Sequence, residues 1–297
     1  MSKSILAVLL SALLFLAHPA LAEESTKTSS DPVDISTKIL GGTESKSGDW
    51  PWMAALLYSS VSDMWDAQYC SGVLIDKTWV LTAAHCVQGK TTSDIEVAVG
   101  VYDLNNFSGT RIPVKSIHIH PDYNNTTTPT NDIALLELTQ ASSQPIIPLF
   151  SGQSDEEVSA SLLGRMLTAI GWGLADGSSN WYYPTKLRQV DLPVVADSYC
   201  NDINSYPLIA SQLCAGWNKG KDVCKGDSGG PVVTMIDNRW THVGLVSYGM
   251  PCIDAVGDYG VYTRTSKFVD FIKEKVPDAT FTRRPPQPLP WVLLLMN

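Results

Sequence analysis

The chain contains 297 residues, 44% of them hydrophobic and 17% charged, with a formal net charge of −9 and an isoelectric point near 4.9. This length suffices for one large domain or two ordinary ones, and the hydrophobic content suffices for a substantial core. The acidic balance argues against a general nucleic-acid-binding protein, which is usually basic.

The first 22 residues have the features of a secretory signal peptide. Lys3 supplies a positive charge, residues 5–17 form an apolar run, and Ala20-Leu21-Ala22 matches a cleavage signal. The run is too short for a membrane span, and the polar segment that follows makes a buried core helix the weaker alternative. We therefore predict secretion, with a flexible polar pro-segment over residues 23–38.

Short β-like runs separated by turn signals fill residues 39–276. The clearest runs are "GVLIDKTWVLTAA", "DIALLELT", "RMLTAIGWG", "QVDLPVV", "GPVVTMI" and "THVGLVSYG". Only residues 266–276 have apolar side chains at helical spacing, with Ser266 as the predicted cap. Many strands with few helices favour a β-sandwich or a β-barrel architecture.

The last segment, residues 277–297, is rich in proline and ends in a short apolar run. Proline favours an extended, poorly packed linker, and residues 291–296 are too few to span a bilayer. A disordered tail is one interpretation. A sorting or anchoring signal and a partner-docking peptide remain open.

Six cysteines occur in the chain, and an even number in an exported protein indicates disulfide bonds. They are Cys70, Cys86, Cys200, Cys214, Cys224 and Cys252. Six cysteines allow 15 pairings, so counting alone does not choose one. A zinc site is the competing interpretation, and the absence of any Cys-x-x-Cys pair weakens it.

Residues 221–233, "KDVCKGDSGGPVV", contain one serine, Ser228, among glycines. A serine hydroxyl becomes nucleophilic only beside a base, usually a histidine that a third group orients. His85, in "LTAAHC", is the strongest candidate for this base because a disulfide at Cys86 could hold its loop. Three other histidines, His118, His120 and His242, are predicted to be ordinary strand residues.

Asp132 precedes the apolar run of "TNDIALLEL" and by itself indicates a turn aspartate at the start of a strand. The stretches "TAAHC", "NDIALLEL" and "GDSGGP" nevertheless follow one another in the order His, Asp, Ser. Together with "GWG" at 171–173 and "GVYTR" at 260–264, they resemble the chymotrypsin/trypsin family of serine proteases over residues 39–276. The resemblance implies an all-β fold of two six-stranded antiparallel β-barrels with a C-terminal α-helix. The active site is expected between the barrels.

The same resemblance implies the roles of the reacting groups. Ser228 is expected to be the nucleophile, and His85 the general base and then the acid. Asp132 is expected to fix the tautomer of His85. The backbone N–H groups of Gly226 and Ser228 are expected to form the oxyanion hole.

Substrate selection is also implied by the resemblance. Asp222 is expected at the floor of the S1 pocket, where a carboxylate selects arginine or lysine at P1, the residue before the scissile bond. Gly249 and Gly260 are expected on the pocket walls. Ser247 and Tyr248 are expected to pair with the substrate backbone as an added strand.

Two residues of this pocket depart from the pattern. Val223 stands where many relatives have serine or alanine, and it offers no hydroxyl to a lysine ammonium. We therefore expect arginine to be preferred over lysine. Tyr248 stands where tryptophan is more frequent, and this change should alter nearby subsites more than the chemistry.

The stretch "TKILGG" resembles a zymogen activation site, with cleavage after Lys38. The new ammonium of Ile39 is expected to pair with Asp227 and to order the S1 pocket and the oxyanion hole. An activating protease that cleaves after a basic residue, or self-activation, is therefore implied. The expected partners are protein or peptide substrates and protein inhibitors, and the chain is expected to be a monomer without cofactor or metal.

The family pattern implies the disulfides Cys70–Cys86, Cys200–Cys214 and Cys224–Cys252. A further family disulfide is absent because Leu167 and Thr234 stand at its positions. The main rival to an active protease is a binding module that keeps this fold without catalysis. Such proteins usually lack a triad residue, whereas all three are present in this chain.

Overall fold

A computed structural model describes residues 42–126, 128–152, 162–175, 182–204, 207–216, 221–249 and 259–282. The chain divides into two compact units, residues 1–35 and 36–297, and all the described residues belong to the second. The predicted signal peptide and pro-segment, the activation residues Lys38 and Ile39, and Cys252 lie outside the described residues. The part of the tail after residue 282 also lies outside them.

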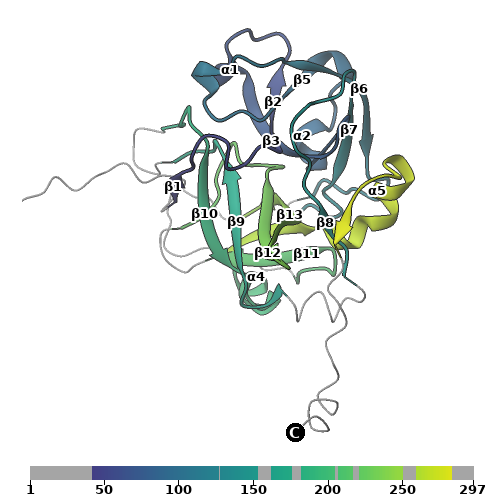
Figure 1. The fold of residues 1–297 in the computed structure, drawn as a ribbon. Coiled ribbons are helices and arrows are strands. Elements are labelled where there is room, and N and C mark those ends of the chain that lie inside the picture. The colour runs from purple at the N-terminus through teal and green to yellow at the C-terminus, as the bar shows by residue number, and fades with distance from the viewer. Residues whose placement is uncertain are drawn as a thin grey trace, which may run out of the picture. The chain divides into compact units, whose positions relative to one another are not determined.

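Six strands close into the first antiparallel barrel, in the order β2-β3-β4-β7-β6-β5 (Figure 1). They are β2 (Met53–Tyr58), β3 (Gln68–Asp76), β4 (Trp79–Thr82), β5 (Ile95–Val99), β6 (Ile112–Ile119) and β7 (Ala134–Leu138). β2 and β7 are rich in leucine and alanine and almost entirely buried, so they supply much of this barrel's core. The predicted run at 72–84 divides into β3 and β4 around a turn in which Asp76 accepts a hydrogen bond from the Thr78 N–H.

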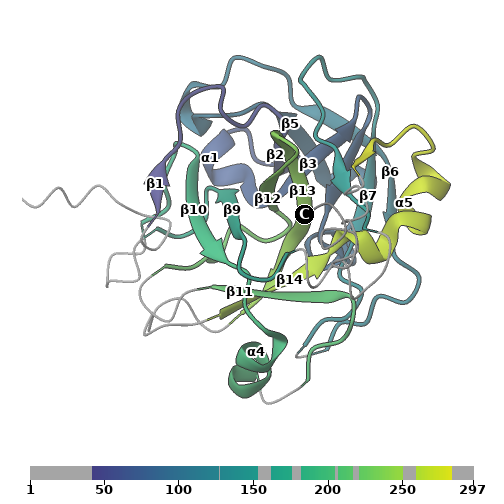
Figure 2. The same ribbon diagram turned by 60° about the horizontal axis from the view of Figure 1, so that its bottom comes forward.

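The second sheet contains nine strands, six of which form the second barrel (Figure 2). These six are β9 (Met166–Gly171), β10 (Arg188–Pro193), β11 (Gln212–Gly216), β12 (Pro231–Ile236), β13 (Arg239–Tyr248) and β14 (Tyr259–Arg264). Their order is β10-β9-β12-β13-β14-β11, and an isolated bridge between Val194 and Ala215 joins the last strand back toward the first. The predicted trypsin-like all-β fold is thus confirmed, with one closed six-stranded barrel and a second sheet that forms a partly closed barrel.

Three short strands extend the second sheet: β1 (Thr43–Glu44), β8 (Leu149–Phe150) and β15 (Phe281–Thr282). β1 pairs with β10 at one edge, and β8 pairs in parallel with β13 and β15. Of the predicted tail, residues 277–297, Phe281 and Thr282 form β15 and pair with β8 at this sheet.

The C-terminal helix begins as a 3-10 turn, η3 (Thr265–Phe268), and continues as α5 (Val269–Lys275). The predicted cap at Ser266 is wrong. Its hydroxyl lies inside the 3-10 turn, where it is buried and has no hydrogen-bond partner among the described residues. Phe268 and Ile272 are buried as the helical spacing predicted.

The remaining helical segments were not predicted because each is short. They are α1 (Met64–Ala67), α2 (Ala84–Val87), η1 (Thr92–Asp94), η2 (Leu104–Asn106) and α4 (Asp197–Asn204). None of the helices in the described part of the chain is both long and apolar enough to cross a bilayer.

Candidate active site

His85 lies on the single turn of α2 and faces Asp132, which precedes β7. The ring Nδ1 of His85 lies 2.7 Å from Oδ2 of Asp132, and the backbone N–H of His85 donates to Oδ1 at 2.9 Å. One carboxylate therefore holds both the main chain and the ring of His85. This arrangement places the proton on Nδ1 and leaves Nε2 as the ring's acceptor.

Asp132 is only 2% exposed, and the second barrel supplies further donors to it. The Ser247 hydroxyl donates to Oδ2 at 2.6 Å, and the Thr263 hydroxyl donates to the Asp132 carbonyl at 2.8 Å. Burial favours a higher pKa for Asp132, but the hydrogen bonds and the charge of His85 outweigh it and lower the pKa below its usual value. The carboxylate is therefore held in its charged form.

Replacing Ser247 by alanine is expected to lower the free energy of unfolding at pH 7 by about 1–3 kcal/mol, because a carboxylate loses a hydrogen bond. Asp132 has a lowered folded pKa, so this stabilisation is present above the unfolded pKa of about 4 and is lost as the pH falls through the folded value. The difference in unfolding free energy between the variant and the parent chain should therefore become smaller at acidic pH. Urea unfolding at pH 7 and pH 3, in a Ser228→Ala background that prevents self-digestion, measures both effects.

The matched control is Thr263→Val, which removes a hydroxyl that binds the main-chain carbonyl of the same aspartate. Since that carbonyl does not titrate, this variant should lower the free energy of unfolding by the same amount at both pH values. If Ser247→Ala lowers the free energy of unfolding equally at pH 7 and pH 3, the Ser247 hydroxyl does not stabilise the charged Asp132 carboxylate.

Ser228 lies in a tight turn between the two barrels. Its carbonyl accepts a hydrogen bond from the Ser71 N–H on β3 at 2.8 Å, and the next N–H, of Gly229, donates to Val246 on β13 at 2.9 Å. Gly229 has a φ of +74°, and a side chain there would collide with Thr82 and with the Ser71 carbonyl. The glycine after Ser228 is thus required for the close approach of the turn to β3.

A disulfide brings the Ser228 turn and His85 into the same region. Cys70 precedes Ser71 and is bonded to Cys86, which follows His85. The Cys86 sulfur lies 3.7 Å from Nε2 of His85. Within the described residues no hydrogen bond joins the Ser228 hydroxyl to that nitrogen, and such bonds often tighten only when substrate is bound.

The main-chain amides of Gly226 and Ser228 are the predicted donors of the oxyanion hole. Gly226 has a φ of +99°, and its carbonyl accepts hydrogen bonds from Gln68 Nε2 at 3.0 Å and from the Ser71 hydroxyl at 3.4 Å. The N–H groups of Gly226 and Ser228 make no hydrogen bond with any described residue. Their use as oxyanion donors stays a prediction.

Asp227 points away from solvent into the second barrel and is 1% exposed. Its carboxylate accepts the N–H groups of Gly173 at 2.8 Å and Cys224 at 2.9 Å. Side chains at Gly171 or Gly173 would occupy the space of this carboxylate, so the "GWG" motif forms its cavity. Burial raises the pKa of Asp227 to about 6 despite the two hydrogen bonds, and no described cation pairs with it.

The residues predicted for the S1 pocket gather around the ends of β13 and β14. Asp222 is 4% exposed and accepts the N–H of Val223 at 2.7 Å. Gly260 lies next to Gly249, and a side chain on Gly260 would meet the Tyr262 hydroxyl. Val223 is half-buried and packs against the core of the second barrel.

Tyr248 is anchored by a residue that the sequence analysis did not identify. Gln212 Nε2 lies 3.1 Å from the Tyr248 hydroxyl and also donates to the Pro129 carbonyl at 2.9 Å. Gln212 and Thr263 both face the site from neighbouring strands, β11 and β14. Thr263 belongs to the quoted "GVYTR" motif, whereas no sequence signal marks Gln212.

The structure contains two of the expected disulfides, Cys70–Cys86 and Cys200–Cys214. Cys252, the expected partner of Cys224, lies outside the described residues. Leu167 and Thr234, which stand at the positions of the missing family disulfide, are both buried next to the pair that Val233 and Thr168 form across β12 and β9.

Two antiparallel barrels, with a histidine–aspartate pair on one and a serine turn on the other, define the class of trypsin-like serine endopeptidases. The family model described as Trypsin matches residues 39–272. The chain therefore belongs to the trypsin family.

Among similar proteins are the vitamin K-dependent protein C of Mus musculus and that of Rattus norvegicus. The mouse protein is 35% identical over 252 residues, covering 82% of this chain and 52% of the relative. The rat protein is 33% identical over 267 residues, covering 86% and 56% respectively. The chain thus spans about half the length of the curated relatives it matches.

Proposed function

We propose that this chain is a secreted serine endopeptidase that hydrolyses peptide bonds after arginine or lysine and is made as a zymogen. The observation that carries the proposal is the buried Asp132 carboxylate, which binds both the ring and the main chain of His85. An ordinary ion pair at the protein surface would have neither this burial nor the two additional hydrogen-bond donors from the second barrel. A histidine that a carboxylate orients, in the same region as a serine held in a tight turn, is the arrangement that acyl transfer requires.

In the proposed reaction, Nε2 of His85 takes the proton of the Ser228 hydroxyl as the serine oxygen bonds to the substrate carbonyl carbon. The negative charge that develops on the carbonyl oxygen is bound by the N–H groups of Gly226 and Ser228. Asp132 stabilises the imidazolium, which then protonates the leaving amine. A water molecule then attacks the acyl-enzyme through the same steps and releases the carboxylic acid product.

Specificity for a basic P1 residue rests on Asp222. Its carboxylate is buried six residues before Ser228, at the position that the family resemblance gives to the floor of the S1 pocket. The guanidinium of arginine can bind a carboxylate through two parallel hydrogen bonds, whereas lysine offers a compact ammonium that needs additional acceptors. Val223 provides none from its side chain, so arginine is favoured.

Replacing Val223 by serine is expected to raise kcat/KM for lysine peptides about 3–10-fold relative to matched arginine peptides, since one added hydrogen bond to an ammonium is worth about 1 kcal/mol. Val223→Ala is the control because it removes the same methyl groups without adding a hydroxyl. Equal kcat/KM for arginine and lysine peptides in the parent enzyme would contradict this explanation of the preference.

Activation is proposed to follow cleavage after Lys38, by another protease with basic specificity or by the enzyme itself. The ammonium of Ile39 would then pair with Asp227. Support comes from the state of Asp227, a fully buried carboxylate whose described partners are two main-chain N–H groups. Such a group is stabilised by a cation, and the Asp227 turn also carries Gly226 and Ser228.

The decisive experiment is to cleave the purified chain after Lys38 and to assay arginine, lysine and phenylalanine peptides of otherwise identical sequence. We expect turnover after arginine and lysine only in the cleaved form. A preference for phenylalanine would refute the role of Asp222, and full activity before cleavage would refute the zymogen.

A further inference from the structure

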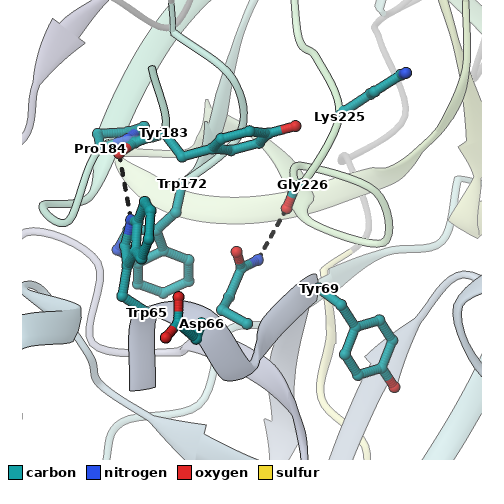
Figure 3. Close-up of a pocket in the computed structure, with 9 residues that line it drawn as sticks. Trp65, Asp66, Tyr69, Trp172, Tyr183, Pro184, Lys225 and Gly226 are labelled. Carbon is teal, nitrogen blue, oxygen red and sulfur yellow. Dashed lines mark hydrogen bonds between the residues drawn. The ribbon is translucent and has the colours of Figure 1, made fainter. Parts of the chain in front are cut away.

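Aromatic side chains gather around two separate hollows of the molecule. The first lies beside α1, between Trp65, Trp172 and Tyr183, and reaches Gly226 at the Ser228 turn (Figure 3). This hollow therefore adjoins the proposed active site. The second hollow has a volume of about 500 Å³, and none of the described residues that line it belongs to the proposed site.

The second hollow, which we call the Trp240 groove, is built on a cluster of tryptophan rings. Trp240, on β13, packs edge-on against Trp50 with the ring centroids 4.9 Å apart. Trp50 packs in the same way against Trp52, with the centroids 5.9 Å apart. Two of these rings thus belong to one packed cluster and also face the groove. The main residues that line the groove are Trp52, Ile146, Pro148, Arg239, Trp240 and Thr280.

Main-chain hydrogen bonds hold the walls of the Trp240 groove in place. The N–H of His242 donates to the Pro148 carbonyl at 2.9 Å, and the N–H of Leu149 donates to the Thr280 carbonyl at 2.8 Å. These bonds join the segment before β8 to β13 on one side and to the segment before β15 on the other. A ligand therefore meets a preformed surface, which lowers the entropic cost of binding.

The polar groups at the Trp240 groove are hydrogen-bond donors. The indole N–H of Trp240 and the guanidinium of Arg239 form no hydrogen bond or ion pair with a described residue. No carboxylate of the described residues lines the groove. A proline-rich segment suits such a surface, because proline has no N–H and a polyproline II helix leaves its carbonyl oxygens without internal partners. Grooves lined by aromatic rings are a recurring binding site for segments of this kind.

The chain itself carries a proline-rich segment close to this groove. Residues 285–290, "PPQPLP", contain four prolines and begin three residues after Thr282, the last residue of β15. β15 is a fixed starting point, because the Lys273 ammonium lies 5.1 Å from the centroid of the Phe281 ring. Thr280, which lines the groove, is two residues before Thr282. The segment therefore begins near the surface that suits it.

The length of the segment also fits. Thr282 lies about 7 Å along the strand from Thr280, at the usual rise of an extended chain. A β-turn reverses the direction of a chain within about four residues, and Arg283 and Arg284 stand where such a turn is needed. Residues 285–290 extend about 19 Å as a polyproline II helix. That length is enough to pass both tryptophan rings of the groove.

We propose that residues 285–290 bind in the Trp240 groove of the same molecule as a polyproline II helix. The proline rings pack on Trp52 and Trp240, and the main-chain carbonyls accept hydrogen bonds from the Trp240 indole and from Arg239. The bound segment fastens β15 and the segment before β8 to the turn between β12 and β13. This interaction does not depend on the proposed catalytic function.

The first test compares the melting temperature of the full chain with that of a chain that ends at Thr282. Both carry Ser228→Ala, which prevents self-cleavage at Arg283 or Arg284. We expect the shorter chain to melt about 2–5 °C lower, as the loss of a bound segment allows in a domain of this size. Replacing the four prolines of residues 285–290 by serine should lower the melting temperature equally. Equal melting temperatures of the full and the shorter chain would overturn the proposal.

Trp240→Leu tests whether the segment binds at this groove. The substitution lowers the melting temperature by itself, because Trp240 packs against Trp50. Ending this variant at Thr282 should then lower it by less than about 1 °C more, since both changes remove the same interaction. Trp79→Leu is the matched control, at a partly buried tryptophan outside the groove, and it should keep the full effect of the shortening. The same effect in Trp240→Leu as in the parent chain would contradict the proposed site.

A photo-cross-linking side chain identifies the bound surface directly. In the full chain with Gln287→p-benzoylphenylalanine, we expect cross-links within one molecule to peptides that contain Trp240 or Pro148. These cross-links should disappear when the four prolines of residues 285–290 are replaced by serine. Cross-links between two molecules, cross-links only to other surfaces, or no cross-links at all would overturn the proposal.

Discussion

Replacing Ser228 by alanine is expected to reduce kcat for an arginine anilide by about 10⁶-fold, the size of the loss when a serine protease lacks its nucleophile. The hydroxyl is the only group in the turn that can form the acyl-enzyme, so no neighbour substitutes for it. His85→Ala should cause a comparable loss. Because the two residues act in one step, the double variant should be no slower than either single variant.

The control is Ser143→Ala, at an exposed serine outside the site, which should keep full activity. Urea unfolding of Ser228→Ala should match the parent closely, since no hydrogen bond of its hydroxyl to a described residue is lost. A variant that retains more than about a thousandth of the parental kcat would mean that Ser228 is not the nucleophile.

Replacing Asp227 by asparagine in the chain cleaved after Lys38 is expected to lower kcat/KM by about 10²–10³-fold. Breaking one side of a buried ion pair costs about 3–5 kcal/mol, and the turn that carries Gly226 and Ser228 loses its anchor. In the uncleaved chain the same change should have little effect on the already low activity. A comparable loss of kcat/KM in the cleaved and the uncleaved chain would show that the role of Asp227 does not depend on cleavage after Lys38.

The uncleaved chain offers an independent measurement through pH. Burial raises the pKa of Asp227 to about 6, so the folded chain binds its proton more tightly than the unfolded chain does. The resulting stabilisation is complete below the unfolded pKa of about 4 and is lost as the pH rises through the folded pKa. Between these values the unfolding free energy should fall by about 3 kcal/mol, and Asp227→Asn should abolish this decrease. Urea titrations of both chains at pH 4 and 7 make the comparison.

Several strands could be predicted from the sequence because they bury a nearly continuous apolar run. The runs that become β7, β9, β12 and β13 all appear as strands within a residue or two of their predicted limits. Short helices were not readable. α1 and α2 have four residues each, which is too few for a helical period, and the Asp63 cap or tertiary packing fixes them.

The site residues His85, Asp132 and Ser228 stood out because motifs of the family mark each of them. Their supporting residues did not stand out in the same way. Ser247 was assigned to substrate binding, yet its hydroxyl donates to Asp132, and this contact depends on the packing of one barrel against the other. Gln212 likewise contacts residues far from it in the chain, Pro129 and Tyr248, which a local pattern does not connect.

The hydrogen bonds to Asp132 also have a consequence for folding order. His85 is 47 residues from Asp132 in sequence, and Ser247 is 115 residues away on the other barrel. Contacts over such separations form late, because long loops must close before they are made. Complete assembly of the triad therefore requires both barrels, and a nascent chain that has folded only its first barrel has no means to digest its neighbours.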